Sequence, residues 1–203
     1  MRTMIKRSLV VSTLVAASLL SLEVLAQDGK RPASPEGTAA TQIGEKWIDV
    51  TYGRPLLRGR KGIFGAGAEY GKTLNANGPL WRAGANATTR IKTELDLEIG
   101  GKKVPAGEYS LFIELKEGAW TAVLSSQPFM KTFDRAKIAE GQTWGAYGYK
   151  PESDVVRAPM TVDKREYSVD QLSIGFRDVT ADGGVLYVIW DNQFGALPFK
   201  VAK

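Results

Sequence analysis

Apolar and polar residues alternate along most of the chain. The clearest example is segment 89–99, whose apolar positions alternate with charged ones. Its apolar residues are Ile91, Leu95, Leu97 and Ile99. Because successive side chains of a strand point to opposite faces of a sheet, this pattern predicts one strand with one face in a core and the other in solvent. Such half-buried strands are typical of antiparallel sheets.

Similar alternation recurs in shorter segments that are separated by turn signals. These segments are 47–52, 109–115, 120–125, 144–149, 155–162, 171–179, 185–190 and 197–201. Gly100 with Gly101, and Glu117 with Gly118, supply hairpin turns between them. About nine strands at this spacing predict an all-β fold, and specifically a jelly-roll-like antiparallel β-sandwich.

Two segments depart from this alternation. Residues 131–140 predict one short helix, with Asp134 placed to cap its first turn. Residues 53–87 have no regular period and are rich in glycine and arginine. Because loops of this length in a compact domain are usually functional or disordered, segment 53–87 is the first place to look for a site.

The N-terminal residues have the layout of a secretory signal peptide. An apolar run over 8–25 follows a basic head and ends in small residues at Ala26. The basic residues are Arg2, Lys6 and Arg7. We therefore predict a signal peptide over 1–26, cleavage near Ala26 and a periplasmic or secreted protein. A retained membrane anchor is the alternative, because the run is nearly long enough to span a bilayer.

The rest of the chain predicts one domain behind a leader. Residues 27–41 are rich in Pro, Ala, Ser and Gly, which predicts a flexible leader. Residues 42–203 then form a single β-sandwich domain. No stable membrane span is expected after cleavage.

Composition excludes several chemistries. The 203 residues include no cysteine and no histidine, which excludes disulfides, a Cys nucleophile, a Ser-His-Asp triad and the usual zinc or haem sites. We expect no metal and no cofactor. The formal net charge is +5, but basic and acidic residues alternate along most of the chain, so no nucleic-acid partner is expected.

Several longer motifs carry a resemblance to a known family. They are VTYGRP at 50–55, GRKGIFG at 59–65, WRAGAN at 81–86, VPAGEYSLF at 104–112 and WGAYGY at 144–149. With these motifs in this order, the chain resembles the exported bacterial proteins known as domain of unknown function 2911. The resemblance implies an all-β domain of an exported protein and brings no established activity. The chain departs from the family at Ala87, where an acidic residue is common.

The long loop concentrates positive charge. Between residues 54 and 90 Glu69 is the sole acid, whereas Arg54, Arg60 and Arg82 are among several basic residues. A guanidinium binds carboxylate, phosphate or sulfate in two-point geometry, so the loop predicts an anion site. The alternative is structural: the arginines pair with strand carboxylates or backbone carbonyls and pin the loop.

Aromatic residues allow two interpretations as well. Trp81, Trp144, Tyr147 and Tyr149 are candidates for stacking on sugar rings, although aromatic side chains in a sandwich more often pack in the core. Strand alternation in segment 144–149 places Trp144 on the face opposite the two tyrosines. Of these residues, Tyr147 is the one we most expect to contact a ligand.

Carboxylates offer a competing hypothesis, a histidine-free glycoside hydrolase that uses paired acids. The candidates are Glu108, Glu114, Asp154, Asp178 and Asp191, which fit no diagnostic spacing. Asp154 and Arg157 are three positions apart, so in a strand they pair directly only if a bulge intervenes.

We favour a non-catalytic protein that binds a small polar or anionic ligand, such as a saccharide. The predicted binding residues are Arg54, Arg60, Trp81, Arg82, Asn86 and Tyr147. The hydrolase is the first alternative. An envelope module that binds another protein through a sheet edge or an aromatic patch is the second.

Overall fold

The computed structural model describes residues 32–75 and 79–203. The predicted signal peptide and the first part of the predicted leader lie outside the described residues. The strands are β1 (Glu36–Ile43), β2 (Lys46–Gly53), β3 (Arg90–Thr93), β4 (Leu97–Ile99), β5 (Lys102–Val104), β6 (Gly107–Lys116), β7 (Ala119–Ser125), β8 (Asp154–Thr180) and β9 (Gly183–Val201). The helices are α1 (Arg135–Ala139) and the short 3-10 turns η1 (Gly67–Glu69) and η2 (Pro151–Ser153).

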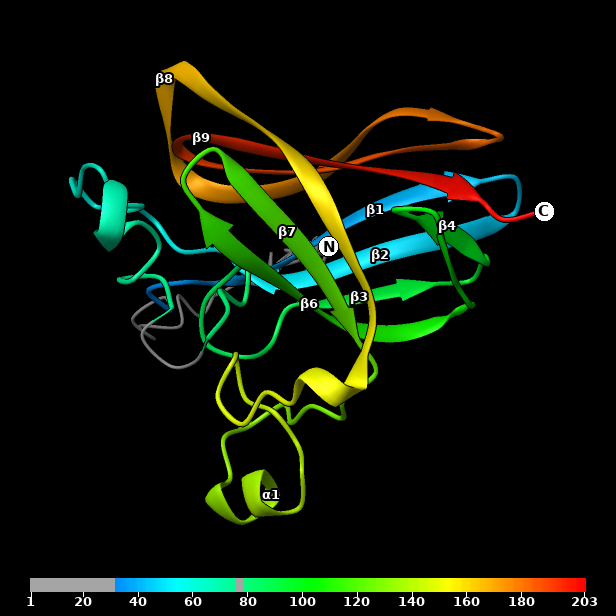
Figure 1. The fold of residues 1–203 in the computed structure, drawn as a ribbon, viewed down its shortest axis with the longest axis horizontal. Coiled ribbons are helices and arrows are strands. Elements are labelled where there is room, and N and C mark those ends of the chain that lie inside the picture. Colours follow the sequence, from blue (N-terminus) through cyan, green and yellow to red (C-terminus); the bar gives the residue numbers. More distant parts are fainter. Residues whose placement is uncertain (1–31, 76–78) are drawn as a thin grey trace, which may run out of the picture. The chain divides into compact units, whose positions relative to one another are not determined.

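These strands form one antiparallel sheet in the order β1-β2-β3-β6-β7-β8-β9-β4-β5 (Figure 1). The predicted all-β class, the antiparallel pairing and the strand number are therefore confirmed. No helix of the described residues is long and apolar enough to cross a membrane.

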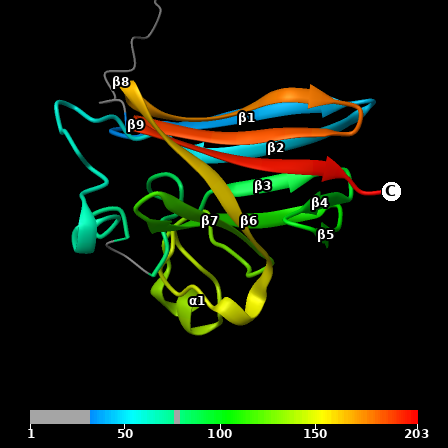
Figure 2. The ribbon, with the colours of Figure 1, turned by 45° about the horizontal axis from the view of Figure 1, so that its top comes forward.

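The long strand β8 connects two parts of the sheet. Its first residues pair with β7, and its residues from Thr161 onward pair with β9 (Figure 2). The segments predicted as separate strands at 155–162 and 171–179 are thus one continuous element. Tyr52 on β2 links the two parts, because its hydroxyl accepts a hydrogen bond of 2.9 Å from the backbone amide of Ile174 on β8.

The core is one large hydrophobic cluster with aromatic residues at its centre, beside a smaller cluster built around Phe112. Phe64 from the long loop stacks on Trp120 at 5.3 Å between ring centroids and meets Trp81 edge-on at 5.8 Å. The Trp120 indole N–H donates to the Tyr70 hydroxyl over 3.0 Å. The loop after β2 is therefore anchored in the core by its own aromatic side chains.

Segment 89–99 is two strands, which corrects the prediction of one. Strand β3 pairs with β2 and β6, whereas β4 pairs with β5 and β9. Between them the Thr93 hydroxyl bonds the backbone amide of Leu95 at 3.1 Å and its carbonyl at 2.8 Å. This local turn moves the chain to the other part of the sheet without interrupting the alternation of buried residues.

Two further predictions are corrected. The predicted flexible leader 27–41 is wrong in its second half, because β1 begins at Glu36 and pairs along its whole length with β2. Segment 144–149 is a pair of turns rather than a strand, with positive backbone φ at Gly145 and Gly148. The predicted helix is confirmed, and the Asp134 carboxylate caps it by accepting from the amide of Ala136 at 2.9 Å.

Candidate functional site

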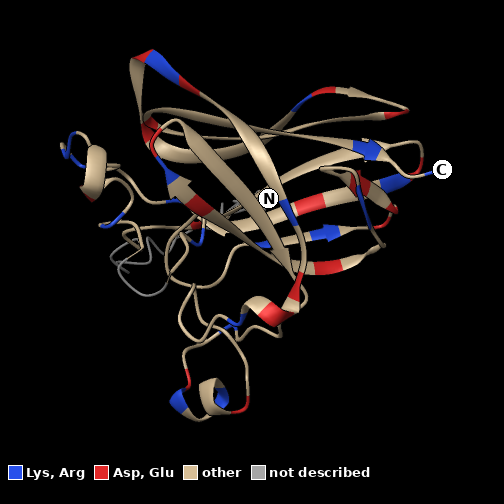
Figure 3. Cartoon of the chain, in the orientation of Figure 1, with Lys and Arg blue, Asp and Glu red and all other residues tan. Residues whose placement is uncertain are grey.

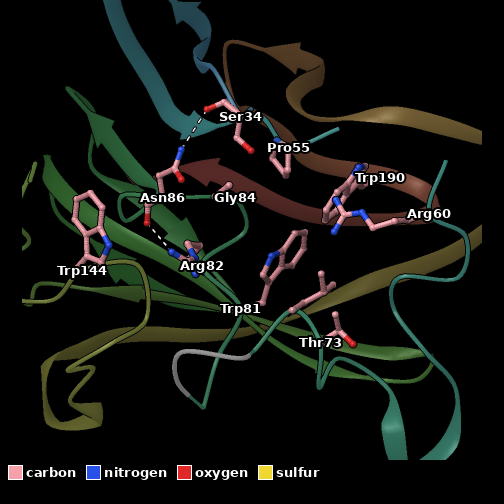
Figure 4. Close-up of a pocket in the computed structure, with 12 residues that line it drawn as sticks. Ser34, Pro55, Arg60, Thr73, Trp81, Arg82, Gly84, Asn86, Trp144 and Trp190 are labelled. Carbon is pink, nitrogen blue, oxygen red and sulfur yellow. Dashed lines mark hydrogen bonds between the residues drawn. The ribbon is translucent and has the colours of Figure 1, made fainter. Parts of the chain in front are cut away.

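A pocket of about 440 Å³ opens beside the long loop, within the range of roughly 300–1,000 Å³ that is common for small-molecule sites (Figure 4). Its lining comes from the residues before β1, the long loop, the segment 81–86, the turn after α1 and β9. The lining residues are Ser34, Pro55, Arg60, Thr73, Leu74, Trp81, Arg82, Gly84, Ala85, Asn86, Trp144 and Trp190. No Asp or Glu of the described residues is among them. We call this site the arginine pocket.

Two tryptophans form its floor. Trp81 and Trp190 stack with 6.3 Å between ring centroids and 12° between ring planes, and they are 1% and 3% exposed. The backbone of Trp81 exchanges two hydrogen bonds with Ile113 of β6. The Trp190 indole N–H donates to the Asp170 carbonyl over 3.1 Å. The floor is therefore rigid, because the two rings stack, the Trp81 backbone is fixed to β6 and the Trp190 ring has a polar anchor.

Arg82 lies on one wall. Ala83 and Asn86 have positive φ, so the chain turns back after Trp81 and brings the Asn86 carbonyl to the Arg82 guanidinium. The Nη1 atom donates to that carbonyl over 2.6 Å. The guanidinium also lies against Gly145, where a Cβ would stand 2.5 Å from Nη1. The Nε and Nη2 groups form no hydrogen bond to any described residue, and Figure 4 shows the guanidinium at the pocket beside Asn86.

Burial changes the electrostatics of this side chain. Loss of solvent around the guanidinium lowers the pKa of Arg82 from its ordinary value. An arginine still carries its charge at neutral pH, because its pKa starts far above that range. None of the ion pairs among the described residues includes Arg82. A partly buried charge without a carboxylate is a favourable place for an anion to bind.

Arg60 lies on the opposite wall, over Trp190. Its Nε donates to the Leu57 carbonyl at 2.9 Å and its Nη2 to the Leu56 carbonyl at 2.8 Å. Its guanidinium carbon lies 5.8 Å from the Trp190 ring centroid, a cation-π contact. These contacts hold the charge at the pocket mouth and leave Nη1 without a partner among the described residues.

Uncharged polar groups complete the lining. Ser34, Thr73 and Asn86 contribute hydroxyl and amide groups to the pocket. The Asn86 side-chain amide donates to the Ser34 carbonyl over 3.3 Å, which ties the residues before β1 to the segment 81–86. The pocket thus combines two cations, several neutral donors and acceptors, and an aromatic floor.

The structure brings together only part of the predicted set. Arg60, Trp81, Arg82 and Asn86 line the arginine pocket, whereas Arg54 and Tyr147 do not. The Arg54 side chain lies over Gly37 of β1, and its buried Nε has no partner within the described residues. Tyr147 is 45% exposed outside the pocket, because the turn at Gly145 replaces the predicted strand.

Trp144 and Trp190 line the pocket although neither is among the six predicted binding residues. Alternation predicts Trp144 on the face opposite Tyr147 and Tyr149, and this prediction is wrong because the segment turns at Gly145 and Gly148. Trp190 alternates regularly in β9, so its pattern indicated core packing only. No sequence signal relates Trp190 to residues more than a hundred positions earlier.

The candidate carboxylates lie elsewhere. Glu108 pairs with Arg90 at 3.4 Å, Asp178 with Arg177 at 3.7 Å, and Glu114 and Asp154 share Arg157. The contact between Asp154 and Arg157 is formed at the expected bulge, because the register with β7 shifts between Leu124 and Ser125. Asp191 accepts from the amide of Gly62 at 3.1 Å and from the Ser168 hydroxyl at 2.8 Å.

Comparison with known proteins gave one family match. The model of the family described as "Protein of unknown function (DUF2911)" matches residues 34–199, which include every residue that lines the arginine pocket. The searches of curated proteins and of solved structures found no significant match.

Proposed function

The chain belongs to the family described as a protein of unknown function, DUF2911, and we propose that this member binds a small anionic ligand in the arginine pocket without catalysing a reaction on it. The observation that carries the proposal is the pair Arg60 and Arg82, which face one cavity that no described carboxylate lines. A ligand carboxylate, phosphate or sulfate would supply the missing counter-charge.

Geometry supports a binding role over hydrolysis. Glycosidases of the usual kind need two carboxyl groups roughly 5 to 9.5 Å apart on either side of the scissile bond. Here the pocket walls carry guanidinium groups, and the candidate acids are used in ion pairs or loop contacts. Charge-assisted hydrogen bonds to a fixed guanidinium would fix the ligand's orientation, and the tryptophan floor would exclude water beneath it.

The test is a thermal-shift and calorimetric comparison of the protein with inorganic phosphate, sulfate, citrate, galacturonate and glucose 6-phosphate. We expect at least one of these anions to raise the melting temperature, because a ligand bound by the native state alone stabilises it, and glucose to have no effect. Arg82→Met and Arg60→Met should each weaken binding by at least about tenfold, since a hydrogen bond to a charged group contributes about 1.5–3 kcal/mol.

Lys61→Met is the matched control. Lys61 is exposed, precedes Gly62 in the same loop and does not line the arginine pocket. Its loss removes the same charge from the loop and should change affinity by less than about twofold. Equal losses in Lys61→Met and Arg82→Met would show nonspecific charge attraction and would overturn the proposal, as would the absence of binding by every anion tested.

We also propose that the protein is exported and acts in the periplasm or outside the cell. The support is the basic and apolar N-terminal pattern that ends at Ala26. Mass spectrometry of the protein from its native host should find a chain that begins at or near Gln27. An intact N-terminus in the membrane fraction would show a retained anchor instead.

A further inference from the structure

An exposed aromatic cluster adjoins the arginine pocket. Its members are Phe133, Trp144 and Tyr147, all from the excursion between β7 and β8 that carries α1 (Figure 1). The ring of Phe133 lies 6.4 Å from that of Trp144 and 6.5 Å from that of Tyr147, between centroids. Phe133 and Tyr147 are 49% and 45% exposed. Trp144 belongs to both regions, because it also lines the arginine pocket.

The cluster is held in place by its surroundings. The buried Gln127 side chain donates to the carbonyls of Gly141 and Gly148 at 2.9 and 2.7 Å and accepts from the amide of Lys150 at 2.8 Å. The Thr88 hydroxyl donates to the Gly145 carbonyl over 3.0 Å, which joins the turn to the segment that carries Arg82. The rings therefore form a prearranged surface whose position relative to Arg82 is fixed, which lowers the entropy cost of binding.

Charge around the cluster favours a negative partner. Lys131, Arg135 and Lys137 are exposed and take part in no ion pair among the described residues. Against these three basic residues, segment 131–140 holds two acids: Asp134, whose carboxylate caps α1, and the exposed Glu140. The segment therefore keeps an excess of one positive charge. Figure 3 shows basic and acidic positions side by side at α1, with the basic ones in the majority over residues 131–140.

The available backbone groups disfavour a peptide that adds as a strand. Trp144 and Tyr147 exchange both of their amide–carbonyl hydrogen bonds, at 3.1 and 2.9 Å, and the amide of Tyr149 donates to the Ala146 carbonyl. A peptide that binds by strand addition pairs its backbone with an open edge, and this turn offers none. Aromatic rings beside hydroxyl and amide groups instead match sugars, whose apolar C–H faces stack on rings while their hydroxyls bond to polar groups.

We propose that the ligand is an acidic oligosaccharide, with the acidic group of one sugar unit in the arginine pocket and the neighbouring sugar rings on Phe133, Trp144 and Tyr147. This inference rests on the proposed function, because it adds a second subsite to the same anion site. Trp144 joins the two subsites, and Lys131, Arg135 and Lys137 attract the acidic groups of further units.

The experiment compares acids of different length by calorimetry on the purified protein. The probes are galacturonate, trigalacturonate, glucuronate, a hyaluronan hexasaccharide and the neutral cellotriose. We expect an acidic oligomer to bind at least tenfold more tightly than its monomer, and cellotriose to bind more weakly than trigalacturonate. The double variant Phe133→Ala/Tyr147→Ala should lower oligomer affinity toward that of the monomer and leave monomer affinity unchanged.

Tyr167→Ala is the matched control, since Tyr167 is 61% exposed on β8 and lies in neither subsite. Monomers or simple anions that bind as tightly as the oligomers would overturn the second subsite and leave the proposed function standing. Absence of binding by every anion would overturn both. Binding to phosphatidylglycerol vesicles that needs Phe133, with no oligosaccharide bound, would overturn the inference in favour of a membrane surface.

Discussion

Arg157 and Arg82 show two different uses of the same side chain. Arg157 donates from Nη1 to Asp154 at 2.9 Å and to the Tyr149 hydroxyl at 3.2 Å, and from Nη2 to Glu114 at 2.5 Å. Arg82 has one partner among the described residues, the Asn86 carbonyl. Burial lowers the pKa of Arg82. The Arg157 side chain, by contrast, is 39% exposed.

The two arginines differ in whether a carboxylate of the fold already pairs with their charge. The carboxylates on β6 and β8 satisfy Arg157, so its charge joins neighbouring strands and has no further need of a partner. Removal of Arg82 from solvent without a carboxylate costs free energy that its single backbone contact does not offset fully. An arginine of this second kind is typical of a site where a ligand provides the missing charge.

The largest expected effect is on stability at Arg157. Arg157→Met should lower the free energy of unfolding by about 2 kcal/mol, because Asp154, whose side chain is 9% exposed, loses its cation while Tyr149 alone still bonds to it. Thermal or urea unfolding measures the change. Lys116→Met removes an exposed partner of Glu114 and should cost less than about 0.5 kcal/mol. Similar losses of unfolding free energy in Arg157→Met and Lys116→Met would contradict a structural role for Arg157.

A glycine substitution tests how Arg82 is positioned. Gly145→Ala places a methyl group where Arg82 lies and adds strain at φ 60°, so we expect a loss of about 1–2 kcal/mol and weaker anion binding. Gly101→Ala is the control, with φ 77° and no atom near its new Cβ. Gly101→Ala should lower the free energy of unfolding in urea through backbone strain alone and leave anion affinity unchanged. Unchanged anion binding by Gly145→Ala would show that the pocket does not depend on this contact.

A smaller effect on stability is expected at Arg82 itself. Arg82→Met removes one hydrogen bond to a backbone carbonyl and leaves no carboxylate unpaired, so the ligand-free protein should lose less than about 1 kcal/mol. Because a domain of this size shifts by roughly 2–4 °C per kcal/mol, its melting temperature should fall by less than about 4 °C. A fall as large as that of Arg157→Met, with anion affinity intact, would mean that Arg82 pins the loop instead of binding a ligand.

The smallest effect concerns acid stability. The hydrogen bond from Lys116, with a further contribution from Arg157, lowers the pKa of Glu114 in the folded state. This pairing therefore stabilises the fold fully above the unfolded value of about 4.3 and less as pH falls through the lower folded value. In Arg157→Met the free energy of unfolding should therefore fall less between about pH 5 and 3 than it does in the unchanged protein. Urea midpoints at pH 7 and pH 3 measure it, with Lys61→Met as the control, because Lys61 is exposed and takes part in no ion pair among the described residues.

The sequence by itself determined the β class and much of the interior. Period-two alternation requires only that one face of each strand be buried, which is a local property, so strands such as β2, β6 and β7 were recoverable from residues alone. The cap of α1 at Asp134 was recoverable for the same reason. Alternation failed where backbone conformation changed locally, at Thr93 and at Gly145, because a turn there keeps the hydrophobic pattern while it redirects the chain.

The tertiary structure decided which residues share the site. Local composition was enough to select Arg60, Trp81, Arg82 and Asn86, since they lie in one loop region with little acidic compensation. Trp190 enters the same pocket only because β9 passes beneath the loop, and Arg54 leaves it because β1 pairs with β2 and covers its side chain. Whether an arginine is satisfied depends on carboxylates from distant strands, as at Arg157, and that pairing is set by sheet register rather than by spacing along the chain.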